Sequence, residues 1–322
     1  GPGETLLYGH LDKQPEATGW DADKGPWTPV IEGDRLYGRG AADDGYALFA
    51  SLQAVRLLHD QGVAHPRCML LIETAEESGS PDLPAYLDHL AGRLGNPGLV
   101  VCLDSGCADY DRLWVTTSLR GMAAGDLTVK VLEQGVHSGD AGGVVPSSFR
   151  IARQLLARIE DGATGTIQLP ALAADIPEER REQAHRAAEV IGDALAAKYP
   201  WAGETQANAS APSELVLNRT WRPALEVIGA DDLPPSAEAG NVLRPQTTLR
   251  LSLRLPPTVD GQTATQAMAD ALTREPPQQA SVSFRAGGSA NGWNAPPFAG
   301  WLGDSLEKSA QAWFGQSAVF MG

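Results

Sequence analysis

The sequence predicts an α/β fold: a mostly parallel sheet with flanking helices, into which an α+β domain with an antiparallel sheet is inserted. Unbroken apolar runs at 5–8, 68–72 and 99–103 alternate with a helical pattern at 45–58. This alternation is typical of parallel strands that are buried on both faces. After about residue 117, strands alternate apolar and polar residues, which indicates an antiparallel sheet with one solvated face.

The first helix has a clear start. Leu48, Leu52 and Val55 recur at helical spacing, and Asp43 and Asp44 stand directly ahead of them. An aspartate just before an apolar periodic segment is typical of a helix N-terminus. We therefore expect a helix from about residue 45, entered through an acidic loop.

The inserted part has strands of period two and helices of period 3.6. Leu127, Val129 and Val131 share one face of a strand at 126–131. The leucines at every second position of 249–255 do the same, with Arg250, Ser252 and Arg254 opposite. Helices are expected at 147–160, where Ile151, Leu155 and Ile159 share a face, and from Pro177 to Lys198.

The last stretch returns to the first pattern. After a Gly-rich segment at 287–293, a helix near 302–313 and a strand near residue 318 are expected. The simplest organisation is a first domain at 1–117, an inserted domain at 118–295 and a return segment of the first domain at 296–322.

Composition excludes two partner classes. The chain of 322 residues has 40 acidic and 25 basic residues, a net charge of −15, which disfavours a nucleic-acid surface. No apolar run approaches the roughly 18 residues of a membrane helix, so no membrane partner is expected. Three cysteines are too few for a disulfide framework, and we expect a reducing, cytoplasmic compartment.

Acidic and histidine residues gather where the predicted strands end. The carboxyl ends of parallel strands form the crevice in which α/β proteins bind ligands. The residues concerned, one of them from the loop before the first helix, are His10, Asp12, Asp43, Glu76, Glu77 and Asp104. So many carboxylates would repel one another unless cations lay between them. Imidazole with carboxylates suits zinc, and a carboxylate-rich set also admits manganese or cobalt, so the pattern indicates a dinuclear hydrolytic site.

Four segments make this pattern specific, and they are Tyr8–Asp12, Gly38–Gly45, Glu76–Ser80 and Leu103–Gly106. They resemble the successive motifs of the co-catalytic metallopeptidase family that contains carnosinase, aminoacylase and glutamate carboxypeptidase. The similarity continues into Leu119–Gly121 and Val136–Gly139, where the lid domain of that family begins. The spacing is most like the dipeptidase branch, which implies metal-dependent hydrolysis of the amide bond of dipeptides or small peptides.

The resemblance also implies a ligand set. His10, Asp43 and Asp104 would hold one divalent ion, and Asp43 would bridge to a second ion held also by Glu77. Two Zn²⁺ ions are expected, with Mn²⁺ or Co²⁺ as the alternatives.

Catalytic roles follow from the same resemblance. Glu76 would be the general base, and Asp12 would orient the imidazole of His10. Part of this has a physical basis, because one of two adjacent glutamates can bind metal while its neighbour stays free for proton transfer. Asp12 lies two residues from His10 on an extended segment and so projects in a similar direction.

The inserted domain would act as a lid and a dimerisation domain. In similar enzymes a lid histidine, here His137, crosses to the partner subunit and steadies the oxyanion. Arg254 would grip the substrate carboxylate, a bidentate task suited to guanidinium, and Asn241 would add a polar contact. A homodimer is therefore implied.

Two departures from the family pattern stand out. The family has a lysine after the Asp-Asp pair, whereas this chain reads Asp43-Asp44-Gly45-Tyr46. Similar enzymes also complete the second ion's site with a histidine in the C-terminal part, and no remaining histidine here is a substitute. We expect the chain to be truncated at both ends, with an incomplete second site that would leave it inactive.

Two other functions stay open. An N-acyl-amino-acid deacylase needs the same ions and a different substrate pocket. A binding or scaffold protein would keep the fold without turnover, and the missing histidine favours it for this chain.

Overall fold

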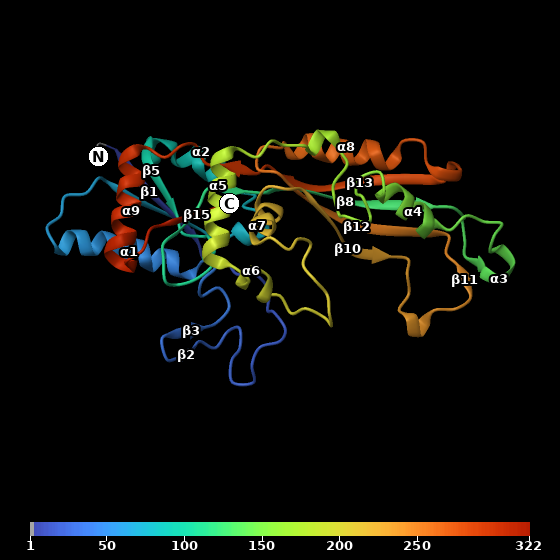
Figure 1. The fold of residues 1–322 in the computed structure, drawn as a ribbon, viewed down its shortest axis with the longest axis horizontal. Helices are drawn as coiled ribbons and strands as arrows, with labels where there is room; N and C mark the ends of the chain where they lie inside the picture. The colour runs from blue at the N-terminus through green and yellow to red at the C-terminus, as the bar shows by residue number, and fades with distance from the viewer. Residues whose placement is uncertain (1–2) are drawn as a thin grey trace. The chain divides into compact units, whose positions relative to one another are not determined.

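The computed structural model describes residues 3–322, which form two compact units. Among them, residues 3–106 belong to the first unit, and the second unit is Cys107–Gly322 (Figure 1). The domain boundaries expected at residues 117 and 295 differ from this division and remain a prediction.

A parallel sheet of three strands is the centre of the first unit. Its order is β4-β1-β5, with β1 at Glu4–His10, β4 at Cys68–Glu73 and β5 at Pro97–Cys102. Both pairings with β1 are parallel. Helix α1, Gly45–Asp60, packs on β1 and β4, and α2, Leu83–Leu94, precedes β5. The strand–helix alternation and the α/β class predicted from the sequence are confirmed.

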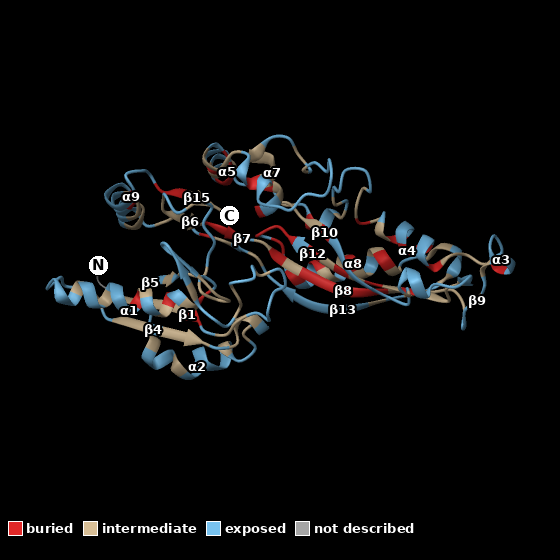
Figure 2. Cartoon of the chain, turned by 90° about the horizontal axis from the view of Figure 1, so that it is seen from below, coloured by how far each residue is buried: buried red, intermediate tan, exposed pale blue. Residues whose placement is uncertain are grey.

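Burial of these strands on both faces was a wrong prediction. Apart from Gly9 and His10, the residues of β1, β4 and β5 are half-buried or exposed, as Figure 2 shows. Leu70 is 37% exposed and Val100 is 56% exposed. An apolar run shows that a strand can be buried, but the elements that cover each face decide whether it is.

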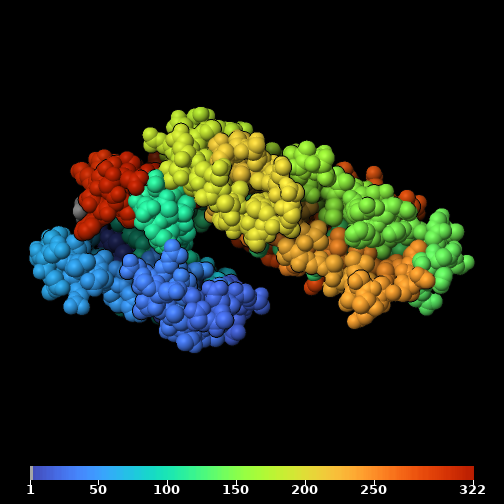
Figure 3. All heavy atoms as spheres, turned by 60° about the horizontal axis from the view of Figure 1, so that its bottom comes forward, coloured from blue at the N-terminus to red at the C-terminus, as the bar shows by residue number. Residues whose placement is uncertain are grey.

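A long connection leads from β1 to α1. It contains the hairpin of β2, Val30–Glu32, and β3, Arg35–Tyr37. Much of it is exposed, and Figure 3 shows this part of the chain, in blue, at the surface. The short 3₁₀ turn η1, Glu76–Ser78, follows β4.

The second unit contains a four-stranded antiparallel sheet in the order β10-β12-β8-β13. Helices α4, Ser148–Leu156, and α8, Gly261–Thr273, pack against its strands. The strands are β8 at Gly121–Lys130, β10 at Ala224–Asp231, β12 at Gln246–Leu255 and β13 at Ser281–Ala290. This confirms the predicted sheet with helices on one side.

The core of the second unit is the apolar face of this sheet. Leu251, Leu253 and Leu255 are fully buried, and so are Ile151 and Leu155 on the helix above them. On the opposite face of β12 the polar residues are half-buried or exposed. The alternation in the sequence therefore identified the correct buried face.

Shorter elements complete the second unit. They are β6 at Trp114–Thr116, β7 at Ser118–Leu119, β9 at Val136–His137, α3 at Ser138–Ala141, η2 at Pro170–Leu172, α7 at Pro212–Thr220, η3 at Ser236–Glu238, β11 at Val242–Leu243, η4 at Pro277–Gln279 and β14 at Trp293–Asn294. Helix α9, Gly300–Phe314, leads to β15, Val319–Met321, which pairs in parallel with β6.

The helix expected from Pro177 to Lys198 is broken in two. Helix α5 covers Glu178–Ile191 and α6 covers Ala194–Ala197. Between them Gly192 has φ 53°, a positive φ that glycine adopts without strain and that does not continue a right-handed helix. Among the described residues, no helix has the length and apolar character that crossing a membrane requires.

Candidate metal centre

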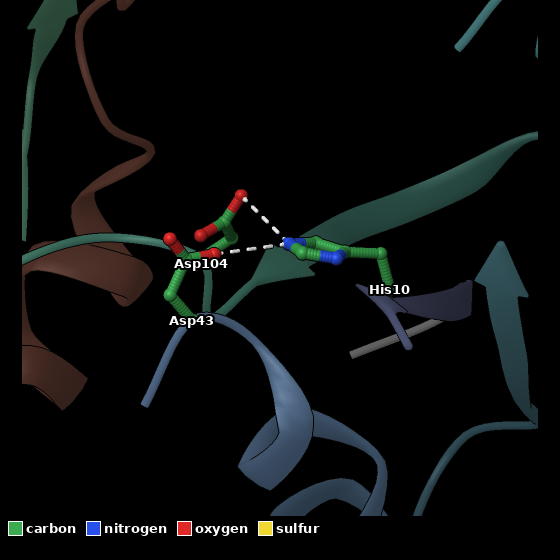
Figure 4. A group of neighbouring side chains, drawn as sticks. All are labelled: His10, Asp43 and Asp104. Atoms are coloured by element: carbon green, nitrogen blue, oxygen red, sulfur yellow. Dashed lines mark ion pairs between the residues drawn. The ribbon is translucent and has the colours of Figure 1, made fainter. Parts of the chain in front are cut away.

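His10 is the centre of an acidic cluster in the first unit. It is the last residue of β1, and only 1% of its surface is exposed. Its Nε2 lies 3.3 Å from Oδ1 of Asp43 and 3.6 Å from Oδ2 of Asp104, as Figure 4 shows. One ligand atom from each of these three residues fits within 4.8 Å of the others.

Three separate segments bring these side chains together. Because β1 and β5 are parallel neighbours, their carboxyl ends lie at one edge of the sheet, and Asp104 follows β5 there. Asp43 comes from the loop before α1, which packs on β1. The structure thus collects three of the four predicted metal ligands at one point.

The hydrogen bonds of the imidazole leave a single free nitrogen. Nδ1 of His10 donates to the backbone carbonyl of Asp12 at 3.1 Å, so the neutral ring has its lone pair on Nε2. Nε2 is buried and makes no hydrogen bond with any described residue. It faces carboxylate oxygens, which are also acceptors. Acceptors that converge with no donor between them are the arrangement that a divalent cation binds, so these residues fit a metal ion.

Asp12 holds two parts of the centre at once. Its carbonyl receives the His10 ring proton, and its carboxylate accepts the backbone N–H groups of Glu76 at 3.2 Å and Glu77 at 2.9 Å. Burial opposes the charge on this carboxyl, but the N–H of Glu77 and its neighbours hold the pKa of Asp12 below its ordinary value. Asp12 therefore fixes the turn that presents both glutamates, besides the ring that it was expected to orient.

The two glutamates point to different partners. Oε2 of Glu76 lies 3.9 Å from Nε2 of His10, on the side of the cluster. The Glu77 carboxylate instead accepts the backbone N–H of Gln14 at 3.2 Å and its side-chain amide at 2.5 Å. Glu77 lies outside the three-residue group, so its role as a ligand remains a prediction.

The pKa values of Glu76, Asp104 and His10 are all raised. Burial, with the charge of Asp104, raises the pKa of Glu76. Burial, with the charge of Asp43, raises the pKa of Asp104. Burial disfavours the charged ring of His10, but the Asp104 carboxylate and the Asp12 carbonyl outweigh it and raise the pKa. Each of these shifts reduces the negative charge that the acidic cluster carries.

Asp44 does not cap α1 in the way its position before the helix predicted. It stands at the N-cap but makes no side-chain capping bond. Its Oδ2 accepts the backbone N–H of His10 at 3.3 Å, and the residue is fully buried. The carboxylate ties the loop before α1 to the end of β1.

The predicted lid residues lie in the second unit. His137 caps α3, with Nδ1 accepting the N–H of Gly139 at 3.1 Å. The backbone carbonyl of Asn241 accepts the backbone N–H of Ser138 at 2.9 Å, so Asn241, which directly precedes β11, lies beside the end of β9 that carries His137. Strand β11 directly precedes β12 in the chain, whereas exposed Arg254 lies near the far end of β12. At roughly 3.4 Å per residue, Arg254 is about 27 Å along the strand from Gln246, the first residue of β12.

Sequence reasoning missed several supporting residues. Gln14 orients Glu77, and the hydroxyl of Tyr8 and Oγ of Ser80 both donate to Glu73, the last residue of β4. The hydroxyl of Tyr46 donates to the carbonyl of Leu103, one residue before Asp104. Gln14 and Tyr46 each stand a few residues from a predicted ligand, and that proximity was the available signal.

Comparison with known proteins gives a consistent result. A family model described as Peptidase family M20/M25/M40 matches residues 6–312. The chain is 28% identical over 258 residues to the cysteinylglycine-S-conjugate dipeptidase of Corynebacterium striatum, covering 78% of this chain. It spans about half, 53%, of that relative's own length.

Two further proteins are similar. The structure of the dipeptidase Dug1p from Saccharomyces cerevisiae aligns with a TM-score of 0.73 at 21% identity, covering 99% of this chain and 67% of that one, so the fold is shared. The succinyl-diaminopimelate desuccinylase of Gluconobacter oxydans is 48% identical over 73 residues, which are 22% of this chain and 18% of that protein.

Proposed function

This chain belongs to Peptidase family M20/M25/M40, and from that membership we propose that it is a metal-dependent hydrolase that cleaves the amide bond of dipeptides or small peptides. The family and its dipeptidase branch were predicted from the sequence motifs and are confirmed. One observation carries the proposal: the buried Nε2 of His10, without a hydrogen-bond partner among the described residues, faces the carboxylates of Asp43 and Asp104.

The proposed ligands of one ion are His10, Asp43 and Asp104. Asp43 would also bind a second ion, together with Glu77. When bound, such ions acidify a water molecule and polarise the carbonyl of the scissile amide. Zn²⁺ is the proposed metal, because imidazole and carboxylate ligands suit it, and Mn²⁺ and Co²⁺ are the alternatives. Asp12 holds His10 in the tautomer that offers Nε2 to the ion.

Glu76 is the proposed general base. Its carboxylate lies beside the cluster, 3.9 Å from Nε2 of His10, and its backbone is fixed by Asp12. Burial raises its pKa, which favours accepting a proton from the attacking water and returning it to the leaving amine. A raised pKa suits a group that must both take and give a proton.

The substrate contacts are proposals for the second unit. Exposed Arg254 can offer its guanidinium to a peptide carboxylate, and His137 of β9 and Asn241, just before β11, are also exposed. We propose a homodimer in which His137 serves the partner's site. The cytoplasmic location remains an expectation, which the three free cysteines favour.

The experiment has two parts. Titration of the metal-free chain with Zn²⁺, followed by elemental analysis, should give at least one ion per chain, and one rather than two if the second site needs a further histidine. Glu76→Gln should then lower kcat for dipeptides by about 10²–10⁴-fold with metal content unchanged. Loss of the metal in this variant would remove Glu76 from the base role, and absence of binding to the wild-type chain would refute the metal centre.

An N-acyl-amino-acid deacylase is the second candidate. The 48% identity to a desuccinylase over 73 residues favours it, because that enzyme removes an acyl group as its name states. Assays of a dipeptide panel against a panel of acylated amino acids separate the two functions. A chain that binds zinc and cleaves neither panel would indicate the scaffold alternative.

A further inference from the structure

Two arginines of the second unit lie on neighbouring strands, where β8 begins and β12 ends. Arg120 directly precedes β8, and Met122, two residues later, is the antiparallel partner of Arg254 on β12. Directly opposed residues of an antiparallel pair have Cα atoms about 4.5–5.5 Å apart, and their diagonal neighbours are within reach of long side chains. Arg120 is therefore a diagonal neighbour of Arg254.

Hydrogen bonds fix the guanidinium of Arg120 at the end of helix α7. Its Nη1 donates to the backbone carbonyls of Asn218 and Arg222, each at 3.3 Å. Asn218 is followed directly by Arg219, the next residue of the helix. Arg222 leads into β10, whose first residue is the partner of Arg254 on the other side of β12. Arg120, Arg219 and Arg254 thus gather at one end of the sheet and are called the arginine cluster below.

The positive charges of this cluster have no counter-charge. Within the described residues, no carboxylate forms an ion pair with any of its three members, whereas Arg222 beside them is paired with Glu214 at 2.7 Å. Burial, with the like charges of Arg254 and Arg219, lowers the pKa of Arg120 to about 10. The chain has 40 acidic and 25 basic residues, so carboxylates are plentiful elsewhere. Like charges held together repel one another, and a bound anion would relieve that repulsion.

The cluster also keeps hydrogen-bond donors for a ligand. The carbonyls at the end of α7 occupy only Nη1 of Arg120, and its Nε and Nη2 have no partner in the described part of the chain. The side chains of Arg219 and Arg254 are exposed. A guanidinium binds a carboxylate through two parallel N–H···O bonds. One carboxylate would offset one of the three charges, whereas a dicarboxylate would offset two.

We propose that the arginine cluster is a binding site for a dicarboxylate group. The family resemblance gives Arg254 a single substrate carboxylate, and the proposal adds Arg120, Arg219 and a second negative charge. Such a group could be the C-terminal glutamate or aspartate of a peptide, which carries two carboxylates, or a free dicarboxylate. Only the peptide source rests on the proposed function.

The test of the site is calorimetric titration of the full chain with glutarate, a dicarboxylate, and with butyrate, a monocarboxylate of similar size. Glutarate should bind more tightly than butyrate. Arg219→Gln and Arg254→Gln should each weaken glutarate binding about 3–10-fold, because each removes one charged partner of a carboxylate. Both side chains are exposed, so the Tm should stay unchanged.

The matched control is Arg150→Gln. Arg150 is an exposed arginine of α4, the helix that packs on the apolar face of the sheet, and its loss should leave the Kd for glutarate unchanged. Equal affinities for glutarate and butyrate would overturn the proposal, and so would glutarate binding that neither cluster variant weakens. Tighter binding of inorganic phosphate than of glutarate would overturn the dicarboxylate assignment.

Hydrolysis assays distinguish the two sources. Alanyl-glutamate and alanyl-glutamine have similar shapes and differ by one negative charge. A higher kcat/KM for alanyl-glutamate that Arg219→Gln removes would assign the site to the substrate, and glutarate binding without this preference would assign it to a free dicarboxylate. A chain that cleaves neither dipeptide would count against the proposed function, whereas the glutarate titration would still decide whether the cluster is a dicarboxylate site.

Discussion

Asp12 joins the predicted base to the predicted ligand, and replacing it tests that connection. Asp12→Asn keeps one acceptor oxygen and the backbone carbonyl that receives the His10 ring proton, but it removes the charge and one of two bonds to the Glu76–Glu77 turn. A hydrogen bond to a charged group contributes about 1.5–3 kcal/mol. Because about 1.4 kcal/mol corresponds to a factor of ten, losing this bond should lower the fraction of molecules with the turn in its competent geometry about 10–100-fold.

We therefore expect kcat/KM for a dipeptide to fall about 10–100-fold in Asp12→Asn, with metal content unchanged. Asp12→Ala removes both bonds and should lower kcat/KM further. The assay is steady-state hydrolysis of a dipeptide with elemental analysis of the same preparation. Asp34→Asn, an exposed position in the β2–β3 hairpin, is the matched control and should change neither quantity.

Two results would refute this reasoning. Wild-type kcat/KM in Asp12→Asn would mean that the turn is held by other contacts. Loss of metal, with normal turnover for each remaining metal-bound molecule, would mean that Asp12 acts through His10 alone.

Two predictions concern the second unit. On its sheet, Asp126 accepts from Arg250 at 2.9 Å and from Arg285, and these partners lower the pKa of Asp126. The ionised Asp126 should therefore stabilise the fold fully above about pH 4, and this contribution should disappear as the pH falls through the lowered pKa. Asp126→Asn should lower the free energy of unfolding by about 1 kcal/mol at pH 7 and by little in acid, measured by urea unfolding. Leu251→Ala, in the buried face of β12, should cost about 2–5 kcal/mol in the same assay, whereas Ile228→Ala, at an exposed position of β10, should stay within about 0.5 kcal/mol. Equal costs at Leu251 and Ile228, or an Asp126→Asn cost that persists in acid, would contradict these assignments.

Much of the fold could be predicted because local patterns and global packing agree. The leucines of β12 repeat with the period of a strand, Ile151 and Leu155 of α4 stand at helical spacing, and both sets are buried in one core. The prediction failed where burial depends on distant elements, as for Leu70 and Val100 in the parallel sheet. It also failed at Asp44, whose position predicted a helix cap and whose partner is the backbone of His10.

The candidate site could also be predicted only in part from the sequence. Residue type and placement near strand and helix ends were enough to select the acidic cluster around His10, and the family resemblance then singled out His10, Asp43 and Asp104 as the ligands of one ion, which remains a prediction. The partners of Asp12 and Glu77 could not be predicted, because the turn at Glu76–Ser78 and the path of Gln14 follow from the folded connection.

Composition, periodicity and motif order were sufficient to identify the α/β class, the buried face of the antiparallel sheet and the family of this protein. They could not establish that one nitrogen and two carboxylates from three distant segments meet within a few ångströms. That proximity depends on parallel pairing of β1 with β5 and on the packing of α1, which align the strand ends and the helix entrance at one edge. Local sequence sets conformational preference over a few residues, whereas electrostatic repulsion and its relief by a cation depend on distances that only the assembled fold defines.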